Sequence, residues 1–274
     1  MLRALLASLK ISAGSQSPQG KKRGFALLSA WILIGQLLGL ATVLEREFVR
    51  PPSASAGVNG ISANGSGGCA TATGTGAFAI GVDAVANGFK ATALGASAQA
   101  VNDGATAIGR QANAAGYVSY AGGSFANATG NAATAIGRRA NAAGSNSFAG
   151  GSYANASGAG SVAIGSQSNA SKLRATAIGA DATANKAYST ALGTCSTANG
   201  SYSTALGAFS TASGAYSTAS GYCATASGYS SLALGDSANA TGDYSTASGY
   251  LANASGNSAV AMGSNSTSAN EAAI

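Results

Sequence analysis

Small and large side chains alternate along most of the chain in short runs. In "SVAIG", residues 161–165, Ser161 and Ala163 are small, Val162 and Ile164 are large and aliphatic, and a glycine ends the run. Alternate side chains of a β-strand point to opposite faces, so this run predicts a strand with one small face and one apolar face. Because the pattern returns every 14 residues, we expect a folded stack of similar strands.

The glycine that ends each run is the most regular feature, and we call it the marker glycine. It stands at 14 positions spaced by 14 residues: Gly81, Gly95, Gly109, Gly123, Gly137, Gly151, Gly165, Gly179, Gly193, Gly207, Gly221, Gly235, Gly249 and Gly263. Gly67 extends this series one step towards the N-terminus. Alanine stands two residues before every marker, and alanine or serine stands four residues before it.

A second glycine follows most markers after seven residues, and Asn102, Lys172, Lys186 and Asn270 replace it elsewhere. Glycine and asparagine tolerate left-handed backbone angles, so we expect a turn at this place. Each coil then has two strands of about five residues and two turns. The inward positions of the second strand are also small, as at Ala154 and Ala156, so the two strands can pack closely. The pattern predicts an all-β, narrow solenoid of about 14 coils.

One outward column is apolar. Ten coils place a large aliphatic residue directly before the marker: Ile80, Leu94, Ile108, Ile136, Ile164, Ile178, Leu192, Leu206, Leu234 and Met262. Where this residue is Gly122 or Gly150, an aromatic residue, Tyr120 or Phe148, stands two positions earlier. At roughly 4.8 Å per coil the rod is about 65–70 Å long. Because a soluble monomer rarely exposes so long an apolar stripe, we expect the column to be an interface with further copies of the chain.

The N-terminal part has a different composition. Residues 24–44 are uncharged and long enough to span a bilayer as a helix. The basic segment 1–23 has no acidic residue, which places it on the cytoplasmic side and the repeats outside the cell. Segment 24–44 is a transmembrane anchor or a signal peptide, and both readings predict export. Residues 45–62, with Pro51 and Pro52, are expected to be a linker, and residues 271–274 a C-terminal tail.

Charge and chemistry narrow the functional classes. Residues 1–73 carry seven Lys/Arg and two Glu, and the remainder carries seven Lys/Arg and six Asp/Glu, so the repeats have a net charge of only +1 and do not favour a nucleic-acid partner. The chain has no histidine, and its acidic residues are isolated in different coils. We therefore expect no enzyme, no metal site and no cofactor. Two basic pairs, Arg138 with Arg139 and Lys172 with Arg174, are expected to be solvated turn residues.

Two further columns carry reactive or aromatic side chains. Cys69, Cys195 and Cys223 each follow a glycine of the 14-residue series by two positions. Cys195 and Cys223 are two coils apart, roughly 9–10 Å, which is too far for a disulfide within one chain. The tyrosines Tyr188, Tyr202, Tyr216 and Tyr244 stand nine positions after a marker. They form either a stacked cover for the edge of the roll or an aromatic edge that contacts a ligand.

The repeat motif resembles that of a known family. "SVAIG" at Ser161–Gly165, together with the variants "FAIG", "ATALG", "ATAIG", "STALG" and "SLALG", is similar to the YadA-like head repeat of trimeric autotransporter adhesins over residues 63–270. The resemblance implies a left-handed parallel β-roll and a homotrimer whose aliphatic column faces the threefold axis. It also implies display at the cell surface or outer membrane, or release from the cell, and adhesion to host matrix, host cells or other bacteria.

Two other functions stay open at this point. A passive fibre shaft or spacer needs only the rod. An ice-binding or crystal-surface-binding solenoid would use a second outward column, formed by Asn113, Asn127, Asn141, Asn155, Asn169, Thr183, Thr197, Thr211, Thr225, Asn239 and Asn253. The partners expected for the adhesin are two further copies of the chain, an extracellular-matrix or cell-surface ligand, and the membrane if residues 24–44 are retained.

Overall fold

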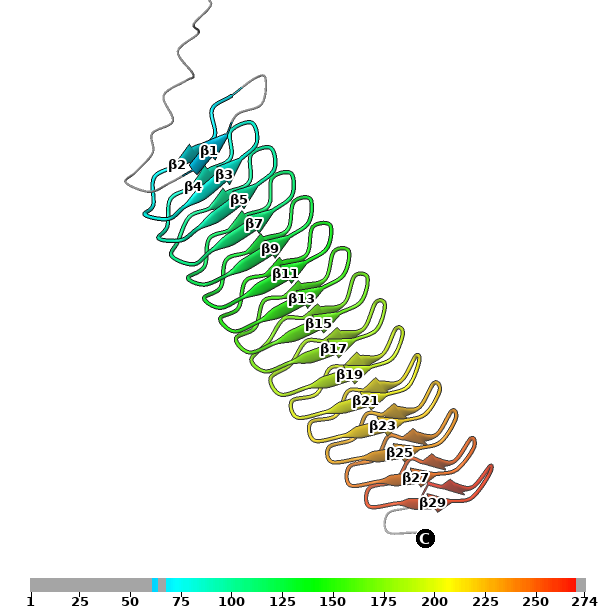
Figure 1. Cartoon of the computed structure of the whole chain (residues 1–274). Coiled ribbons are helices and arrows are strands. Elements are labelled where there is room, and N and C mark those ends of the chain that lie inside the picture. The colour runs from blue at the N-terminus through cyan, green and yellow to red at the C-terminus, as the bar shows by residue number, and fades with distance from the viewer. Residues whose placement is uncertain (1–60, 64–67, 270–274) are drawn as a thin grey trace, which may run out of the picture. The chain divides into compact units, whose positions relative to one another are not determined.

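The computed structural model describes residues 61–63 and 68–269. The chain divides into two compact units, Met1–Ser53 and Ala54–Ile274, and all described residues belong to the second. The expectations for segments 1–23, 24–44 and 271–274 therefore lie outside the described residues, as does most of the predicted linker. Within the described part, the second unit is a parallel β-solenoid with the shape of a rod (Figure 1).

Each coil contributes one strand to each of two parallel 15-stranded sheets. The first sheet consists of β1 (Ile61–Ala63), β3 (Phe78–Ile80), β5 (Thr92–Leu94), β7 (Thr106–Ile108), β9 (Tyr120–Gly122), β11 (Thr134–Ile136), β13 (Phe148–Gly150), β15 (Val162–Ile164), β17 (Thr176–Ile178), β19 (Thr190–Leu192), β21 (Thr204–Leu206), β23 (Thr218–Ser220), β25 (Leu232–Leu234), β27 (Thr246–Ser248) and β29 (Val260–Met262). The second consists of β2 (Thr71–Ala72), β4 (Val85–Ala86), β6 (Gln99–Ala100), β8 (Asn113–Ala114), β10 (Asn127–Ala128), β12 (Asn141–Ala142), β14 (Asn155–Ala156), β16 (Asn169–Ala170), β18 (Thr183–Ala184), β20 (Thr197–Ala198), β22 (Thr211–Ala212), β24 (Thr225–Ala226), β26 (Asn239–Ala240), β28 (Asn253–Ala254) and β30 (Thr267–Ser268).

The strands are shorter than the pattern predicts, with three residues in the first sheet and two in the second. The turns take up the difference, yet hydrogen bonding between coils continues through them. For example, the amide of Tyr188 in one turn donates to the carbonyl of Leu173 in the preceding coil at 2.9 Å. The backbone is therefore tied to the neighbouring coil almost all the way around.

The 14-residue register holds from β2 onwards, and only β1 departs from it. Phe78 of β3 pairs with Thr92 of β5, which is 14 residues later, whereas Ile61 of β1 pairs with Phe78, which is 17 residues later. The first coil thus contains three additional residues. Gly67 lies outside the described residues, but Thr71 of β2, four residues after it, pairs with Val85 of β4, which stands four residues after Gly81. The residues Ile61 and Ser62, expected in the linker, belong to β1.

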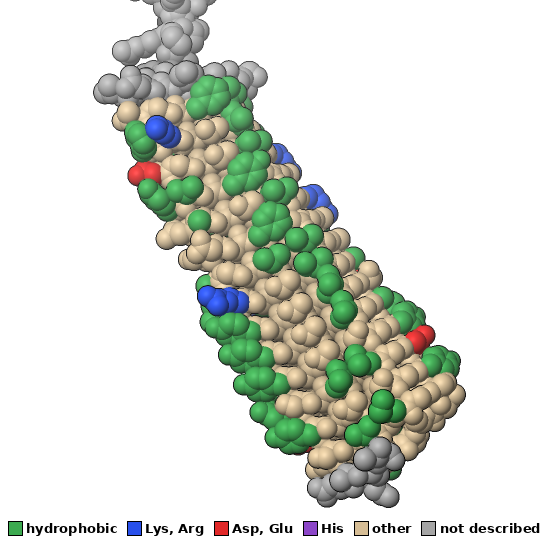
Figure 2. Space-filling model, turned by 60° about the horizontal axis from the view of Figure 1, so that its bottom comes forward, with side chains coloured by type: hydrophobic (Ala, Val, Ile, Leu, Met, Phe, Trp, Pro, Cys, Tyr) green, Lys and Arg blue, Asp and Glu red, His purple; other side chains and the backbone are tan. Residues whose placement is uncertain are grey.

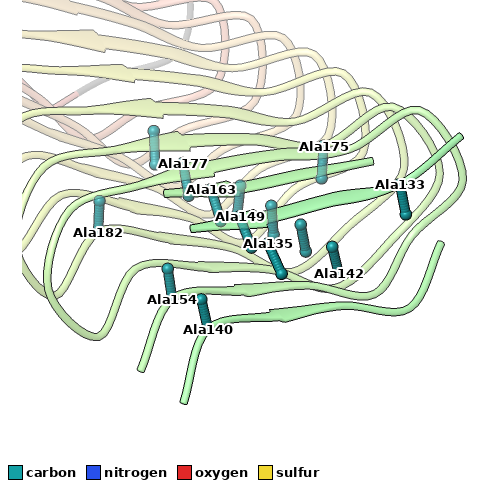
Figure 3. Packing of buried hydrophobic residues seen from close by; sticks show 14 of the residues in the cluster. Ala133, Ala135, Ala140, Ala142, Ala149, Ala154, Ala163, Ala175, Ala177 and Ala182 are labelled. Carbon is teal, nitrogen blue, oxygen red and sulfur yellow. The ribbon is translucent and has the colours of Figure 1, made fainter. Parts of the chain in front are cut away.

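The interior of the roll consists of very small side chains. Among the described residues, every buried apolar side chain is an alanine and every buried polar side chain is a serine. Figure 3 shows the alanines of the two sheets pointing towards one another, with Ala135, Ala149 and Ala163 from the first sheet and Ala142 and Ala154 from the side of the second. The prediction of a small inner face on both strands is confirmed. Because the sheets approach so closely, no larger side chain has room between them.

Most of the serines in this interior donate a hydrogen bond to a turn carbonyl. Nine serines stand at the first inward position after a turn and donate to the carbonyl three residues earlier at 2.6 to 2.9 Å, as Ser119 does to Gly116. The hydroxyl oxygens of Ser161, Ser231 and Ser245, at the same place in other coils, have no partner. The turn carbonyl thus explains why serine replaces alanine at this inward position in many coils.

The two glycine series have different physical causes. The marker glycines from Gly81 to Gly249 have φ between 125 and 144°, and a Cβ atom there would also collide with the carbonyl group of the next marker. The glycines seven residues later, such as Gly88, do not have positive φ. The turn predicted at this place is present, but the left-handed angle from which it was inferred does not occur at the glycine itself. Glycine is favoured there because a Cβ atom would meet the backbone of the next coil, while the left-handed residue lies two positions further on, as at Lys90 with φ 54°.

Candidate functional site

The predicted apolar column lies on the outer face of the first sheet. Ten aliphatic residues end its strands, and eight of them are exposed, from 37% for Leu234 to 70% for Met262. Leu94 and Ile178, the other two, are half-buried. Figure 2 shows hydrophobic side chains following one another along this unit. Their alternation with inward alanines, as in Thr134-Ala135-Ile136, is what turns them outward.

Aromatic rings fill two of the four places where the column lacks an aliphatic side chain, and Ser220 and Ser248 occupy the other two. A Cβ atom on Gly122 would lie 2.7 Å from the ring of Tyr120, and one on Gly150 would lie 2.7 Å from the ring of Phe148. Each ring therefore lies over the glycine two residues later, in the space that isoleucine or leucine occupies in other coils. The predicted compensation of volume between these two positions is confirmed.

The outer face of the second sheet is polar and is held together by its own side chains. In an asparagine ladder formed by Asn113, Asn127, Asn141, Asn155 and Asn169, each amide nitrogen donates to the side-chain oxygen of the next asparagine at 2.8 to 2.9 Å. Asn239 and Asn253 make the same bond at 3.1 Å. These bonds occupy amide groups that the ice-binding alternative would use to order water.

The tyrosine column follows one turn edge of the roll. The rings of Tyr188 and Tyr202 are stacked at 4.8 Å between centroids, and those of Tyr202 and Tyr216 at 5.1 Å, each pair inclined by only 2°. Tyr244 joins the column through Tyr229, which makes edge contacts with Tyr216 at 5.6 Å and with Tyr244 at 5.4 Å. Tyr229 is missing from the predicted column because it stands one position earlier in its turn.

The backbone of the tyrosine column is strained. Tyr188, Tyr202, Tyr216 and Tyr244 have φ between 56 and 59°, a region that bulky residues rarely adopt. They are nevertheless exposed, from 37% for Tyr188 to 61% for Tyr244. Stacking between coils offsets part of the conformational cost, since such aromatic pairs contribute about 0.5–1.5 kcal/mol each. The result is a continuous aromatic surface, here called the tyrosine edge, which is open to solvent.

The cysteines and acidic residues do not form a chemical site. In the described part Cys69, Cys195 and Cys223 are free, and the prediction that Cys195 and Cys223 do not pair within one chain is confirmed. Asp103 and Asp243 accept hydrogen bonds at 2.8 Å from the backbone amides of Phe89 and Tyr229, each 14 residues earlier, and so support turns. No cluster of three or more histidine, cysteine, aspartate or glutamate side chains that could bind a metal ion occurs among the described residues.

The predicted membrane span, residues 24–44, lies outside the described residues. Across residues 61–63 and 68–269, no helix has the length and hydropathy needed to cross a membrane.

Comparison with known proteins agrees with the fold and with the repeat motif. The family model described as YadA head domain repeat matches residues 72–98, 86–112, 100–117, 128–154, 151–168, 156–182, 170–194, 198–222, 226–252, 240–266 and 254–274. No curated protein sequence gives a significant match. The matched segments cover most of the chain and repeat with the period of the coils. The chain therefore belongs to the YadA head repeat family, a non-enzymatic family of extracellular surface-adhesin heads.

Proposed function

We propose that the solenoid is a homotrimeric adhesin head at the cell surface, with the aliphatic column at the contact between the three chains. The observation that carries the proposal is the exposed column on the first sheet, from Ile80 to Met262. Water-exposed apolar surface of this length is unfavourable, and a closed oligomer buries it without further protein. The rings of Tyr120 and Phe148 support the same arrangement, because they keep the face filled at two of the four places where aliphatic side chains are absent.

The mass of residues 54–274 in solution tests the trimer. Light scattering after size exclusion should give three times the chain mass, and circular dichroism should show β-structure. A folded monomer would contradict the trimeric head, because the column would then be stable in water without a partner. A dimer would also contradict the threefold contact while leaving the buried column intact.

We expect the ligand of this head to be an extracellular-matrix or cell-surface molecule that contacts the tyrosine edge. The edge presents stacked rings with exposed faces and hydroxyl groups, and tyrosine is enriched in protein recognition surfaces for this combination. The alternative is a passive shaft, in which the rings only cover the turns. Removal of the rings should weaken binding by an adhesin and should leave a passive shaft unaffected.

Binding of cells or matrix components to a double variant, Tyr202→Ala with Tyr216→Ala, separates the adhesin from the shaft. For an adhesin that binds through this edge, adhesion should fall at least about tenfold, since aromatic anchors commonly contribute 2 kcal/mol or more. Tyr250→Ala is the matched control, because Tyr250 is a similarly exposed tyrosine on the other turn edge. Equal adhesion of both variants and the parent chain would favour the shaft.

A further inference from the structure

A cluster of three arginines and two aromatic rings lies on the turn edge that follows the first sheet. Arg110 and Arg138 stand one position after their marker glycines, and Phe125, Arg139 and Tyr153 stand two positions after theirs. The five residues therefore occupy two adjacent columns over four successive coils. We call them the arginine–aromatic cluster. This edge is separate from the tyrosine edge, which is formed by the other turn of each coil.

The rings and the guanidinium groups alternate along the edge. Phe125 lies 4.4 Å from Arg110 and 5.5 Å from Arg139, measured from ring centroid to guanidinium carbon. The Tyr153 ring lies 4.5 Å from Arg138 and 5.5 Å from Arg139. Each ring thus holds two guanidinium groups by cation–π contact, which restricts the long arginine side chains before any ligand arrives.

Two of these cations share one hydroxyl group. Arg138 donates through Nη1 to the Tyr153 hydroxyl oxygen at 2.8 Å, and Arg139 does the same at 3.3 Å. These two positive groups lower the pKa of Tyr153, with the hydrogen bond from Arg138 as the largest cause. A hydroxyl oxygen accepts only two such bonds, whereas each guanidinium has five N–H donors, so most donors of the cluster point away from it.

No acidic residue balances the cluster within its own columns. The other residues of these columns between the markers Gly109 and Gly165 are neutral, namely Gln111, Ser124 and Ser152. The nearest acidic residues in the two columns are Asp83 and Asp181, each two coils beyond an end of the cluster, or roughly 10 Å away. Three exposed guanidinium groups held close together without a counter-charge favour binding of a multivalent anion.

We infer that the arginine–aromatic cluster binds a sulfated linear polysaccharide, with sulfate groups in the forks of Arg110, Arg138 and Arg139. Guanidinium groups bind such tetrahedral anions through paired N–H donors. Arg110 and Arg138 are two coils apart, roughly 9–10 Å, so a short oligosaccharide can reach both. The extracellular location of the family favours a glycan over a nucleic acid. The nearly neutral repeats also lack the extended basic track that a nucleic acid requires.

Binding of a heparin hexasaccharide to the full chain in non-ionic detergent tests this inference. The triple variant R110Q/R138Q/R139Q should weaken binding at least about tenfold, as expected for the loss of several charge-assisted contacts. The matched control K172Q/R174Q/K186Q removes three positive charges from the other turn edge and should change binding less than about threefold. Added salt should weaken binding by the parent chain, because the charges are exposed.

Tyr153→Phe keeps the ring and removes the shared hydroxyl. It should weaken heparin binding about twofold to fivefold, as expected for an exposed hydrogen bond that positions a charged group. R138Q should raise the pKa of Tyr153 towards its ordinary value, and ultraviolet titration of the tyrosine measures this. An unchanged Tyr153 titration would show that Arg138 does not act on the hydroxyl, and would contradict the cluster geometry.

Three results would overturn the inference. Equal loss of binding in the two triple variants would show attraction by net charge alone. Equal binding of desulfated heparin, or of a single-stranded DNA of matched charge, would exclude sulfate-specific recognition. A lower oligomer mass of R110Q/R138Q/R139Q would identify the cluster as a contact between chains. The trimer and the heparin site can fail separately. A parent chain that is monomeric and still binds heparin would contradict the proposed trimer and would support this site.

Discussion

Each inward position of the roll holds a methyl or hydroxymethyl group, and the two inward positions of a strand are not equivalent. The first lies within reach of the carbonyl group of the preceding turn, as Ser119 shows with its 2.7 Å bond to Gly116. The second, two residues before the marker, is alanine in every coil. At this position a hydroxyl group would be buried between two strands whose backbone groups are already paired.

Serine substitutions at neighbouring inward positions should therefore differ in their effect on stability. Ala133→Ser should change the free energy of unfolding little, because Gly130 supplies the acceptor that other coils use. Ala135→Ser should lower the free energy of unfolding by about 1–3 kcal/mol, which is the cost of a buried polar group without a partner. Thermal unfolding followed by circular dichroism compares the two variants. Equal melting temperatures would show that the turn carbonyl does not decide where serine fits.

The marker glycines allow backbone strain to be separated from packing between coils. Gly165 has φ 125°, and a Cβ atom there would collide with Gly179 of the next coil, whereas Gly263 has φ 103° and nothing within 4 Å. Gly263→Ala should lower the free energy of unfolding by about 1–3 kcal/mol, because it adds conformational strain alone. Gly165→Ala should cost clearly more, because two coils must also move apart. Unfolding in denaturant measures both, and a smaller effect at Gly165 would contradict the close approach of the coils.

At the scale of the element, the asparagine ladder connects five consecutive coils. Asn141 donates to Asn155 and accepts from Asn127, so Asn141→Ala removes two hydrogen bonds and leaves both neighbours with an unpaired group. The expected loss is about 1–3 kcal/mol. Asn141→Thr is the matched control, since threonine occupies this column from Thr183 to Thr225 and should be tolerated better. Amide hydrogen exchange in β10, β12 and β14 should be faster in Asn141→Ala than in Asn141→Thr. Equal exchange rates in the two variants would show that the ladder does not stabilise these strands.

The strands and their faces could be predicted from the sequence because they depend on contacts that recur at one fixed spacing. Ser161 to Ile164 already contain the alternation that separates interior from exterior. The role of Gly88 could not be predicted, because it depends on how closely the next coil approaches. The arginine–aromatic cluster was missed for a related reason. Phe125 and Tyr153 reach the arginines through left-handed turns with φ of 60 and 59°, and a sequence pattern does not specify those angles.

At the scale of the whole molecule, the two outer faces should respond differently to charge. Leu192→Asp with Leu206→Asp places two carboxylates in the aliphatic column and should convert the trimer to single chains, because burying unpaired charge costs several kcal/mol per group. Thr197→Asp with Thr211→Asp places the same charges on the polar face and should leave the mass unchanged. Light scattering of residues 54–274 decides between these outcomes. A trimer that persists in the leucine variant would place the contact elsewhere.

The register of 14 residues from β3 to β29 has a consequence for how the gene can gain or lose repeats. Every internal coil presents the same backbone and the same small interior to its neighbours, so the coils on either side of a lost one can join in register. Unequal recombination between their coding repeats therefore removes or duplicates whole coils, and the remaining strands still pair in register. The length of the rod then changes in steps of about 4.8 Å, while the fold of each remaining coil stays the same.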